Sequence, residues 1–120
     1  MSAAKTTDSD TFIRGADVPV EALEPGIRRQ MLGYGTDLMM CRVLFDKGAE
    51  GSVHSHPHSQ SIYIESGRFL ITVDGKEQEL GAGDSAFVTS NVMHGAVCLE
   101  EGVILDTFSP AREDFLGEGA

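Results

Sequence analysis

The sequence predicts an all-β domain that folds as a sandwich, a jelly roll or a closed barrel. Glycine and proline are frequent, with 14 and 4 residues, and they separate short runs rich in Val, Ile, Leu, Phe and Thr. Such an alternation of strand-forming runs and turn residues is typical of many short strands joined by tight turns. A length of 120 residues suits one domain with one hydrophobic core.

Nine strands and one short helix are expected along the chain. The Asp74-Gly75 pair lies between two strand-like runs and predicts a tight hairpin, because both residue types tolerate a positive φ. A second turn is expected at 81–84, a break between strands at 33–35, and a helix only at 111–116. The expected strands cover residues 27–34, 37–46, 52–56, 59–66, 68–73, 76–80, 85–88, 93–98 and 103–109.

Both ends of the chain are predicted to lie outside the domain. Residues 1–11 are mostly polar and lack the apolar stretch of a signal peptide, so we expect a flexible tail and a cytoplasmic protein. Residues 117–120 are expected to form a second flexible tail, which leaves 12–116 as the domain. No apolar run is long enough to span a membrane.

The chain is strongly acidic, with 9 basic and 19 acidic residues and a formal net charge of −10. This charge repels nucleic acid and anionic membranes, and no cluster of Lys or Arg offsets it locally. Solubility is the simplest explanation of the acidity. An anionic small-molecule substrate would need a local positive centre, such as a metal ion or an arginine.

The two cysteines lie in apolar stretches. Buried, unreactive thiols are therefore expected for Cys41 and Cys98, and a disulfide is disfavoured in a reducing compartment. A metal-ligand role for Cys98 is also disfavoured, because it lies four residues past His94, too far along an extended strand to share an ion with it.

All four histidines fall in two short segments, HSHPHSQ and NVMHG. Alternate residues of a strand face the same side, so His54, His56 and Gln60 are expected to share one face. Unpaired imidazoles and an amide inside a barrel would be costly to desolvate, and a divalent metal ion removes that cost. His94 is expected to supply a further ligand from a neighbouring strand. The sequence thus predicts one divalent transition metal ion, with Ni, Zn, Fe, Mn and Cu all compatible.

The remaining polar residues near these segments are harder to assign. His58 has the parity of the ligands, but Pro57 precedes it and disturbs the strand, so a position at the entrance or behind the ligands is expected. The alternative for every histidine is an exposed or hydrogen-bonded loop residue, which the HxHxxxQ spacing and a distant histidine disfavour. Tyr63 and Arg68 are candidates for lining the site that the sequence does not place.

The histidine segments resemble the two motifs of the cupin superfamily, which implies a single-domain cupin jelly-roll barrel. The residues that match the first motif, including Gln at its Glu position, are Gly48, His54, His56, Gln60 and Gly67. In the second motif Gly83 and His94 match. Thr89, Asn91 and Cys98 stand where the superfamily has Pro, Gly and Asn. A neutral Gln leaves the full charge of the ion at the site, unlike the carboxylate-containing iron dioxygenase sites.

A narrower resemblance, to the KdgF family of pectin-degradation cupins, covers residues 26–116. It is carried by GIRRQMLGYG, HSHPHSQ, SGRF, VDGKEQELGAGDS and NVMHGAVCLEEGV, and most specifically by DTFSPAREDFL. Proteins of this family are metal-dependent and convert 4,5-unsaturated uronate monomers from pectin or alginate lyases into linear keto forms. The resemblance implies that His54, His56, Gln60 and His94 bind the metal. It also implies catalytic roles for Asp106 and Arg112, and substrate-binding roles for Phe108 and Arg112.

Other readings remain open for the function and for each of these three residues. The same barrel can host another small-molecule metalloenzyme, such as an oxygenase or isomerase, or a non-enzymatic sugar- or metal-binding module. Asp106 can form a structural ion pair, Phe108 can be plain core, and Arg112 can simply pair with Glu113 or Asp114. The expected partners are a small anionic sugar and a second copy of the chain, because the free sheet edges suit a homodimer.

Overall fold

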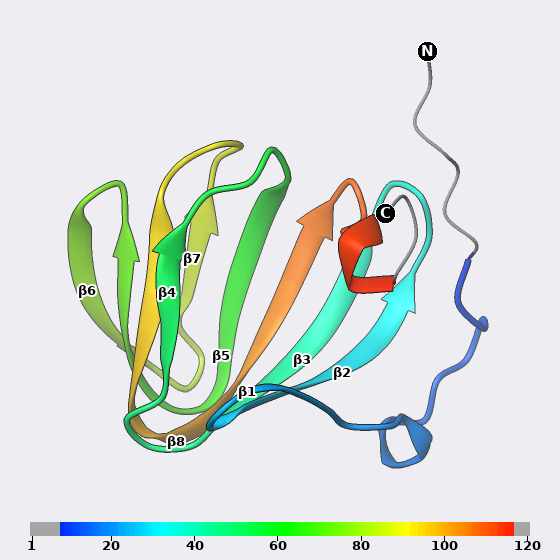
Figure 1. The fold of residues 1–120 in the computed structure, drawn as a ribbon, viewed down its shortest axis with the longest axis horizontal. Coiled ribbons are helices and arrows are strands. Elements are labelled where there is room, and N and C mark those ends of the chain that lie inside the picture. The colour runs from blue at the N-terminus through cyan, green and yellow to red at the C-terminus, as the bar shows by residue number, and fades with distance from the viewer. Residues whose placement is uncertain (1–7, 117–120) are drawn as a thin grey trace.

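The computed structural model describes residues 8–116, which form one curved antiparallel sheet (Figure 1). Eight strands lie in this part of the chain: β1 Glu21–Glu24, β2 Ile27–Tyr34, β3 Met39–Phe45, β4 Glu50–His54, β5 Ser59–Val73, β6 Lys76–Gly81, β7 Ser85–Val88 and β8 His94–Ser109. Two short 3-10 helices are η1 Gly15–Asp17 and η2 Glu113–Leu116. The predicted all-β class is confirmed, and the helix expected at 111–116 is a short 3-10 segment.

The strands follow the order β1-β2-β3-β8-β5-β6, with β4 paired to β8 and β7 paired to β5. Four expected strands turn out to be two: 59–66 and 68–73 are parts of β5, and 93–98 and 103–109 are parts of β8. These two long strands pair with each other along most of their lengths. They form the centre of the sheet, and every other strand except β1 and β2 pairs directly with β8 or β5.

A sharp bend divides each long strand in two. Gly67 has a φ of +82°, and a Cβ atom at Gly67 or at Gly102 would collide with the backbone of the opposite strand. Only glycine allows the two strands to approach so closely here. Because both strands turn back at this bend, the two ends of each lie together at the upper end of the barrel (Figure 1). Residues far apart in sequence, such as Gln60 and His94, therefore come close together.

Local signals explain most of the remaining elements. Asp74 and Gly75 have positive φ values of 52° and 76° and join Val73 to its partner Lys76, which confirms the predicted hairpin. Strand β1 was not expected, because its sequence, EALE, carries no strand preference and all of its residues are exposed. Its pairing with β2 alone holds it in place.

The hydrophobic core lines the barrel interior from the bend of the long strands up to the level of Met39 and Phe108. Its largest fully buried side chains include Phe69, Met39 and Ile64. The rings of Phe45 and Phe69 meet edge to face, with centroids 5.1 Å apart. Cys41 and Cys98 are free and buried, and burial raises the pKa of both thiols, so the predicted unreactive state is confirmed.

The predicted tails fall largely beyond the part of the chain that the structure covers. Residues 1–7 and 117–120 lie outside the described residues. Near the start of the described part, the backbone N–H of Ser9 donates to the carbonyl oxygen of Tyr34 at 2.9 Å. Within residues 8–116, none of the helices has the length and apolar character that crossing a membrane requires.

Candidate metal centre

Three histidines converge at the upper end of the barrel. His54 is the last residue of β4, and it pairs across the sheet with His94, the first residue of β8. His56 lies past the end of β4, so the expectation that this strand reaches residue 56 is wrong. Its loop is nevertheless fixed, because the backbone N–H of Asn91 donates to the His56 carbonyl oxygen at 2.8 Å. Ring nitrogens of the three histidines all lie within 4.8 Å of one another.

A backbone carbonyl orients each of these rings. The Nδ1 atoms of His54, His56 and His94 lie 2.7, 2.9 and 2.9 Å from a carbonyl oxygen. The carbonyls are those of Ser52, His58 and Val92, in that order. Because a carbonyl only accepts hydrogen bonds, each Nδ1 carries the proton of the neutral ring and each Nε2 keeps a free lone pair. Metal-binding histidines are typically held in this way by their second nitrogen.

Two observations indicate that these lone pairs are positioned to bind a cation. The Nε2 atom of His94 is buried and has no hydrogen-bond partner in the described part of the protein. The Nε2 atom of His56 lies 3.0 Å from Oε1 of Gln60, and both atoms are acceptors in the tautomer described above. Facing lone pairs repel each other unless a cation binds both. Three neutral imidazoles and one amide oxygen fit a divalent transition metal ion.

Burial favours the uncharged form of two of the ligand histidines, His56 and His94. Removal from water lowers the pKa of His56 and of His94, and the positive charge of Arg112 acts in the same direction. Neutral imidazole is the form that binds a metal ion, so binding at neutral pH requires little loss of protons from these rings.

Asp106 stands directly behind Gln60. The Gln60 amide donates from Nε2 to Oδ1 of Asp106 at 2.9 Å, which turns its Oε1 toward His56. Burial raises the pKa of Asp106 to about 6, although the hydrogen bond from Gln60 and the charge of Arg112 both lower it. Asp106 is not part of the group of converging ligand atoms, so it is placed to orient a ligand and to face the space beneath it.

A cavity of about 190 Å³ opens beneath the histidines inside the barrel. This volume is many times what one water molecule needs, so the cavity can admit a small polar ligand. Polar wall residues come from both ends of the long strands, and apolar residues complete the wall. The principal members are Arg29, Val43, Phe45, His54, Gln60, Ile62, His94, Ile104, Asp106, Phe108, Arg112 and Phe115.

The three residues singled out in the tail of the sequence meet at this cavity. Phe108 is buried in the core, and its ring centroid lies 5.7 Å from that of His56. The Cζ atom of Arg112 lies 5.2 Å from the Phe108 centroid. Arg112 also donates from Nε and Nη2 to the Asp114 carboxylate, at 3.1 and 2.9 Å. The ion pair anticipated for Arg112 therefore exists, and Nη1 is left without a partner among residues 8–116.

The other candidates lie outside the cavity. His58 is buried beside His56, with ring centroids 5.5 Å apart, and its carbonyl oxygen accepts from His56, but its own ring nitrogens are not among the converging ligand atoms. Tyr63 faces solvent on the outer side of β5, and Arg68 pairs with Glu79 on the surface. Neither Tyr63 nor Arg68 contributes to the cavity wall.

Among the wall residues that sequence reasoning did not assign to the site, Arg29 and Phe115 bear most directly on its chemistry. Arg29 has the same parity as Ile27 and Met31 on β2, so strand parity alone places all three on the inner face. Phe115 lies in the short helix η2 that follows β8 and contacts Phe108 edge to face, with centroids 5.5 Å apart.

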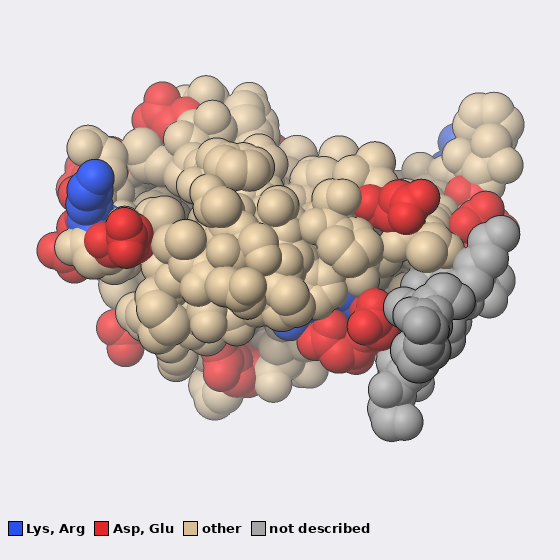
Figure 2. Space-filling view, turned by 90° about the horizontal axis from the view of Figure 1, so that it is seen from above, with Lys and Arg blue, Asp and Glu red and all other residues tan. Residues whose placement is uncertain are grey.

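Charge is distributed unevenly around the mouth of this site. Seen from above, the upper end of the molecule is mostly uncharged, with acidic residues toward its margin (Figure 2). In a chain with a net charge of −10, the positive groups at the site are therefore an exception. Within the described residues, an anionic ligand that enters would meet favourable charge at Arg29 and Arg112 of the cavity wall, and at a cation wherever the histidines bind one.

Comparisons with known proteins agree with this arrangement. A family model described as a cupin domain matches residues 41–108. The pectin degradation protein KdgF of Dickeya dadantii (strain 3937) is 45% identical over 102 residues, which cover 83% of this chain and 93% of the relative. A crystal structure of an RmlC-like cupin from Shewanella frigidimarina NCIMB 400 is 51% identical with a TM-score of 0.89, covering 90% of this chain and 97% of that one. The structure of KdgF from a Halomonas species is 36% identical with a TM-score of 0.86, covering 89% and 99%.

Proposed function

The chain belongs to the cupin family and, within it, to the KdgF proteins, and from this we propose that it is a metal-dependent enzyme that opens 4,5-unsaturated uronate monosaccharides from pectin breakdown to linear keto forms. The observation that carries the proposal is the convergence of His54, His56, His94 and Gln60 beside a cavity, whose wall includes His54, Gln60 and His94. Asp106 and Arg112 line the same cavity.

The reaction moves one proton and breaks one ring bond. The O1 hydroxyl of the cyclic hemiacetal loses its proton, the bond from C1 to the ring oxygen breaks as C1=O forms, and the oxygen stays on C5 as an enolate. Protonation at C4 then gives the 5-keto acid, so atoms and electrons balance without a redox partner. A divalent cation bound by the four side chains supplies the Lewis acidity that stabilises the enolate charge.

Asp106 is the group best placed to move the proton. Its Oδ1 atom is held by the Gln60 amide at 2.9 Å, which fixes the carboxylate against the cavity wall. In that position the carboxylate can accept the proton from the O1 hydroxyl or deliver it to C4. The hydrogen bond to Gln60 connects the Asp106 carboxylate to a proposed metal ligand, so the position of one side chain is fixed relative to the other.

Arg112 and Phe108 hold the sugar. The Nη1 group of Arg112 faces no protein acceptor within residues 8–116, so it is free to bind the substrate carboxylate through a charge-assisted hydrogen bond. Phe108 offers an apolar ring beside His56, against which the flat C4=C5 part of the sugar can pack. Together they would hold the reacting part of the sugar beside Asp106.

The same groups also suit unsaturated uronates that come from alginate. Unsaturated uronates from alginate carry the same C4=C5 bond and carboxylate, and we include them among the substrates.

Three imidazoles and an amide accept Ni, Zn, Fe, Mn or Cu, so elemental analysis of native protein is needed to identify the ion. We place the reaction in the cytoplasm, where oligouronates that have been taken up would be degraded.

A homodimer is also part of the proposal. The outer face of the sheet exposes Met40, Tyr63 and Phe87, with 39%, 44% and 64% of their surfaces accessible. These side chains lie on β3, β5 and β7, three strands of one curved sheet, and a second copy would bury them. Light scattering should report a particle of twice the 12.9 kDa chain mass, and a particle of the single mass would overturn this part.

Turnover tests the function directly. Purified protein should accelerate the loss of ultraviolet absorbance of the C4=C5 bond in freshly generated unsaturated galacturonate. Asp106→Ala should abolish the acceleration with the metal content unchanged, whereas Asp46→Ala, on the exposed surface, should not affect it. Normal turnover by Asp106→Ala would remove Asp106 from the mechanism.

A further inference from the structure

Arg29 is a charged residue inside the barrel that the proposed reaction does not use. On β2 it alternates with Arg28, which points outward and pairs with Asp46 on the surface. Arg29 points inward and is only 8% exposed. An arginine is rarely buried to this extent unless its donors have partners.

Only part of this guanidinium is satisfied by the protein. Its Nε atom donates to Oε1 of Glu21 at 3.1 Å, and its Cζ atom lies 3.9 Å over the ring centroid of Phe115. The two Nη groups have no acceptor among residues 8–116, and Arg29 lines the cavity. A fork of two free N–H donor groups therefore faces the space that the substrate would occupy.

Phe115 separates Arg29 from Arg112. The Cζ atom of Arg112 lies 4.2 Å over the same Phe115 ring. Two cationic groups so close to one ring must lie on opposite faces, because they would clash and repel on the same face. The cavity thus has two guanidinium positions, and Arg112 has the one near Phe108 and the histidines.

The strand register places Arg29 deeper in the barrel. Arg29 pairs with Val43, and Val43 pairs with Ile104 on β8. Asp106 and Phe108 are two and four residues further along β8, so the Arg29 backbone lies one side-chain row below Asp106 and two rows below Phe108. Each row is about 7 Å, because a strand rises by about 3.4 Å per residue.

The two ends of the cavity differ in charge. At the upper end the proposed cation and Arg112 create a positive site that suits the substrate carboxylate. At the deeper end Glu21 already balances the charge of Arg29, and Glu24 also lies on the cavity wall. A combination of guanidinium donors and carboxylate acceptors suits neutral hydroxyl groups, which both donate and accept hydrogen bonds.

Building on the proposed function, we propose that Arg29 is a positioning residue that binds the C2 and C3 hydroxyl oxygens of the uronate. C2 lies across the six-membered ring from C5, so a sugar held by its carboxylate and C5 at the upper end directs C2 and C3 toward Arg29. The planar fork of an arginine matches two neighbouring oxygens. Unsaturated rings derived from galacturonate and from mannuronate differ in configuration at C2, so Arg29 contacts the carbon that distinguishes them.

A binding cycle with unreactive sugars tests this contact. Galacturonate and 2-deoxygalacturonate lack the C4=C5 bond, and their affinities for the metal-loaded protein can be measured by calorimetry. The unmodified protein should bind galacturonate about tenfold or more tightly than the 2-deoxy sugar, and Arg29→Met should bind both equally. Arg28→Met, the outward neighbour, should keep the full difference. An undiminished difference in Arg29→Met would overturn the inference while leaving the proposed function intact.

Two further measurements guard against a folding defect in the buried variant. Arg29→Lys keeps the charge but loses the fork, so it should fold and lose most of the difference between the sugars. A crystal structure of the unmodified protein with galacturonate should place a C2 or C3 hydroxyl within hydrogen-bonding distance of an Arg29 Nη atom. A sugar bound the other way round, with its carboxylate on Arg29, would overturn the inference. Failure of the unmodified protein to bind galacturonate at all would overturn the proposed function and this inference with it.

Discussion

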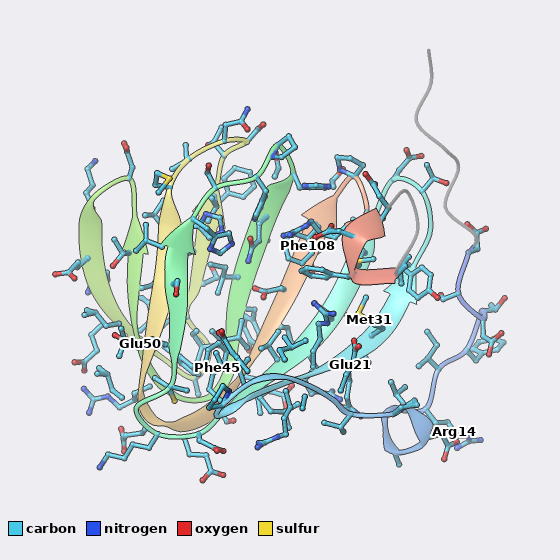
Figure 3. All side chains as sticks on the ribbon, in the orientation of Figure 1. Arg14, Glu21, Met31, Phe45, Glu50 and Phe108 are labelled. Carbon is cyan, nitrogen blue, oxygen red and sulfur yellow. The ribbon has the colours of Figure 1, made fainter. Side chains whose placement is uncertain are left out.

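The upper and lower halves of the barrel interior are built from the same strands and serve different purposes. At the upper end β8 presents His94 and Asp106, whereas near the bend the long strands present only apolar side chains such as Ile64 and Phe69. Phe108 lies toward the upper end and Phe45 toward the lower end of the same interior (Figure 3). The bend at Gly102 makes this division possible, because it brings both ends of one strand to one side.

The difference indicates where stability and chemistry reside. The lower half excludes water and stabilises the fold through burial of apolar surface. The upper half holds histidines whose lone pairs face one another without a donor, an arrangement that is unfavourable until a cation binds. Changes in the two halves should therefore have separable effects, on folding in one case and on metal binding and turnover in the other.

The largest expected effect is the loss of the ion in His94→Ala. Removing the buried imidazole takes away one of four ligands, so purified variant should contain no stoichiometric metal and show no turnover, while circular dichroism remains that of a β-barrel. His58→Ala is the matched control, because it keeps the backbone carbonyl that accepts from His56 and removes only a neighbouring ring that is not a ligand. Elemental analysis distinguishes the two, and loss of metal in His58→Ala would identify a fifth participant at the centre.

A change in the lower half should instead affect stability. Phe69→Ala removes a fully buried ring and should lower the free energy of unfolding by about 3–5 kcal/mol, measured by denaturant titration. The remaining folded, metal-loaded fraction should turn over at the normal rate per molecule. Phe87→Ala, at an exposed position, should change the stability of the monomer by no more than about 0.5 kcal/mol. Similar losses in both variants would contradict the location of the core.

A subtler change separates the charge of the metal ligands from their number. Gln60→Glu keeps an oxygen ligand but adds a negative charge and replaces the amide that donates to Asp106. The variant should retain its metal and lose about 10- to 100-fold in kcat, because the cation becomes less electrophilic and Asp106 loses its hydrogen-bond donor. Metal titration combined with turnover measures both effects. An unchanged kcat would mean that the neutral charge of Gln60 does not contribute to the rate of turnover.

The smallest expected effect is that of Arg112→Lys. A lysine keeps the positive charge near Phe108 but cannot hold Asp114 and a substrate carboxylate at the same time. KM should rise about tenfold, with a smaller change in kcat, in steady-state kinetics on the unsaturated uronate. A kcat loss as large as that of Asp106→Ala would instead give Arg112 a direct part in proton transfer.

The metal centre could be predicted from sequence better than the sheet around it. The HxHxxxQ segment and a distant His94 drew attention to the side chains that converge, but the parity argument was wrong, because His54 ends β4, His56 lies in a loop and Gln60 belongs to β5. The continuity of β5 was missed because Gly67 is a turn signal in sequence, whereas in the structure it permits close contact with Gly102. That contact joins residues 35 positions apart, and no local pattern encodes it.

Two further features of the structure could not be predicted from the sequence, and each has a physical cause. Strand β1 exists only because β2 offers it a partner edge, and such tertiary pairing overrides the weak preferences of its sequence. The role of Arg29 depends on Glu21 and Phe115, which are remote in sequence and meet only in the folded barrel. Asp106 was singled out by family resemblance, and its hydrogen bond to Gln60 became visible only in three dimensions.

Metal dependence of turnover on unsaturated monouronate is the most direct test of the whole account. Native protein should lose its ring-opening activity when a chelator removes the ion, and should regain it when one equivalent of a divalent transition metal is added back. His94→Ala should stay inactive under the same reloading. Full activity of verified metal-free protein would contradict the central claim that a cation bound by His54, His56, Gln60 and His94 carries the chemistry.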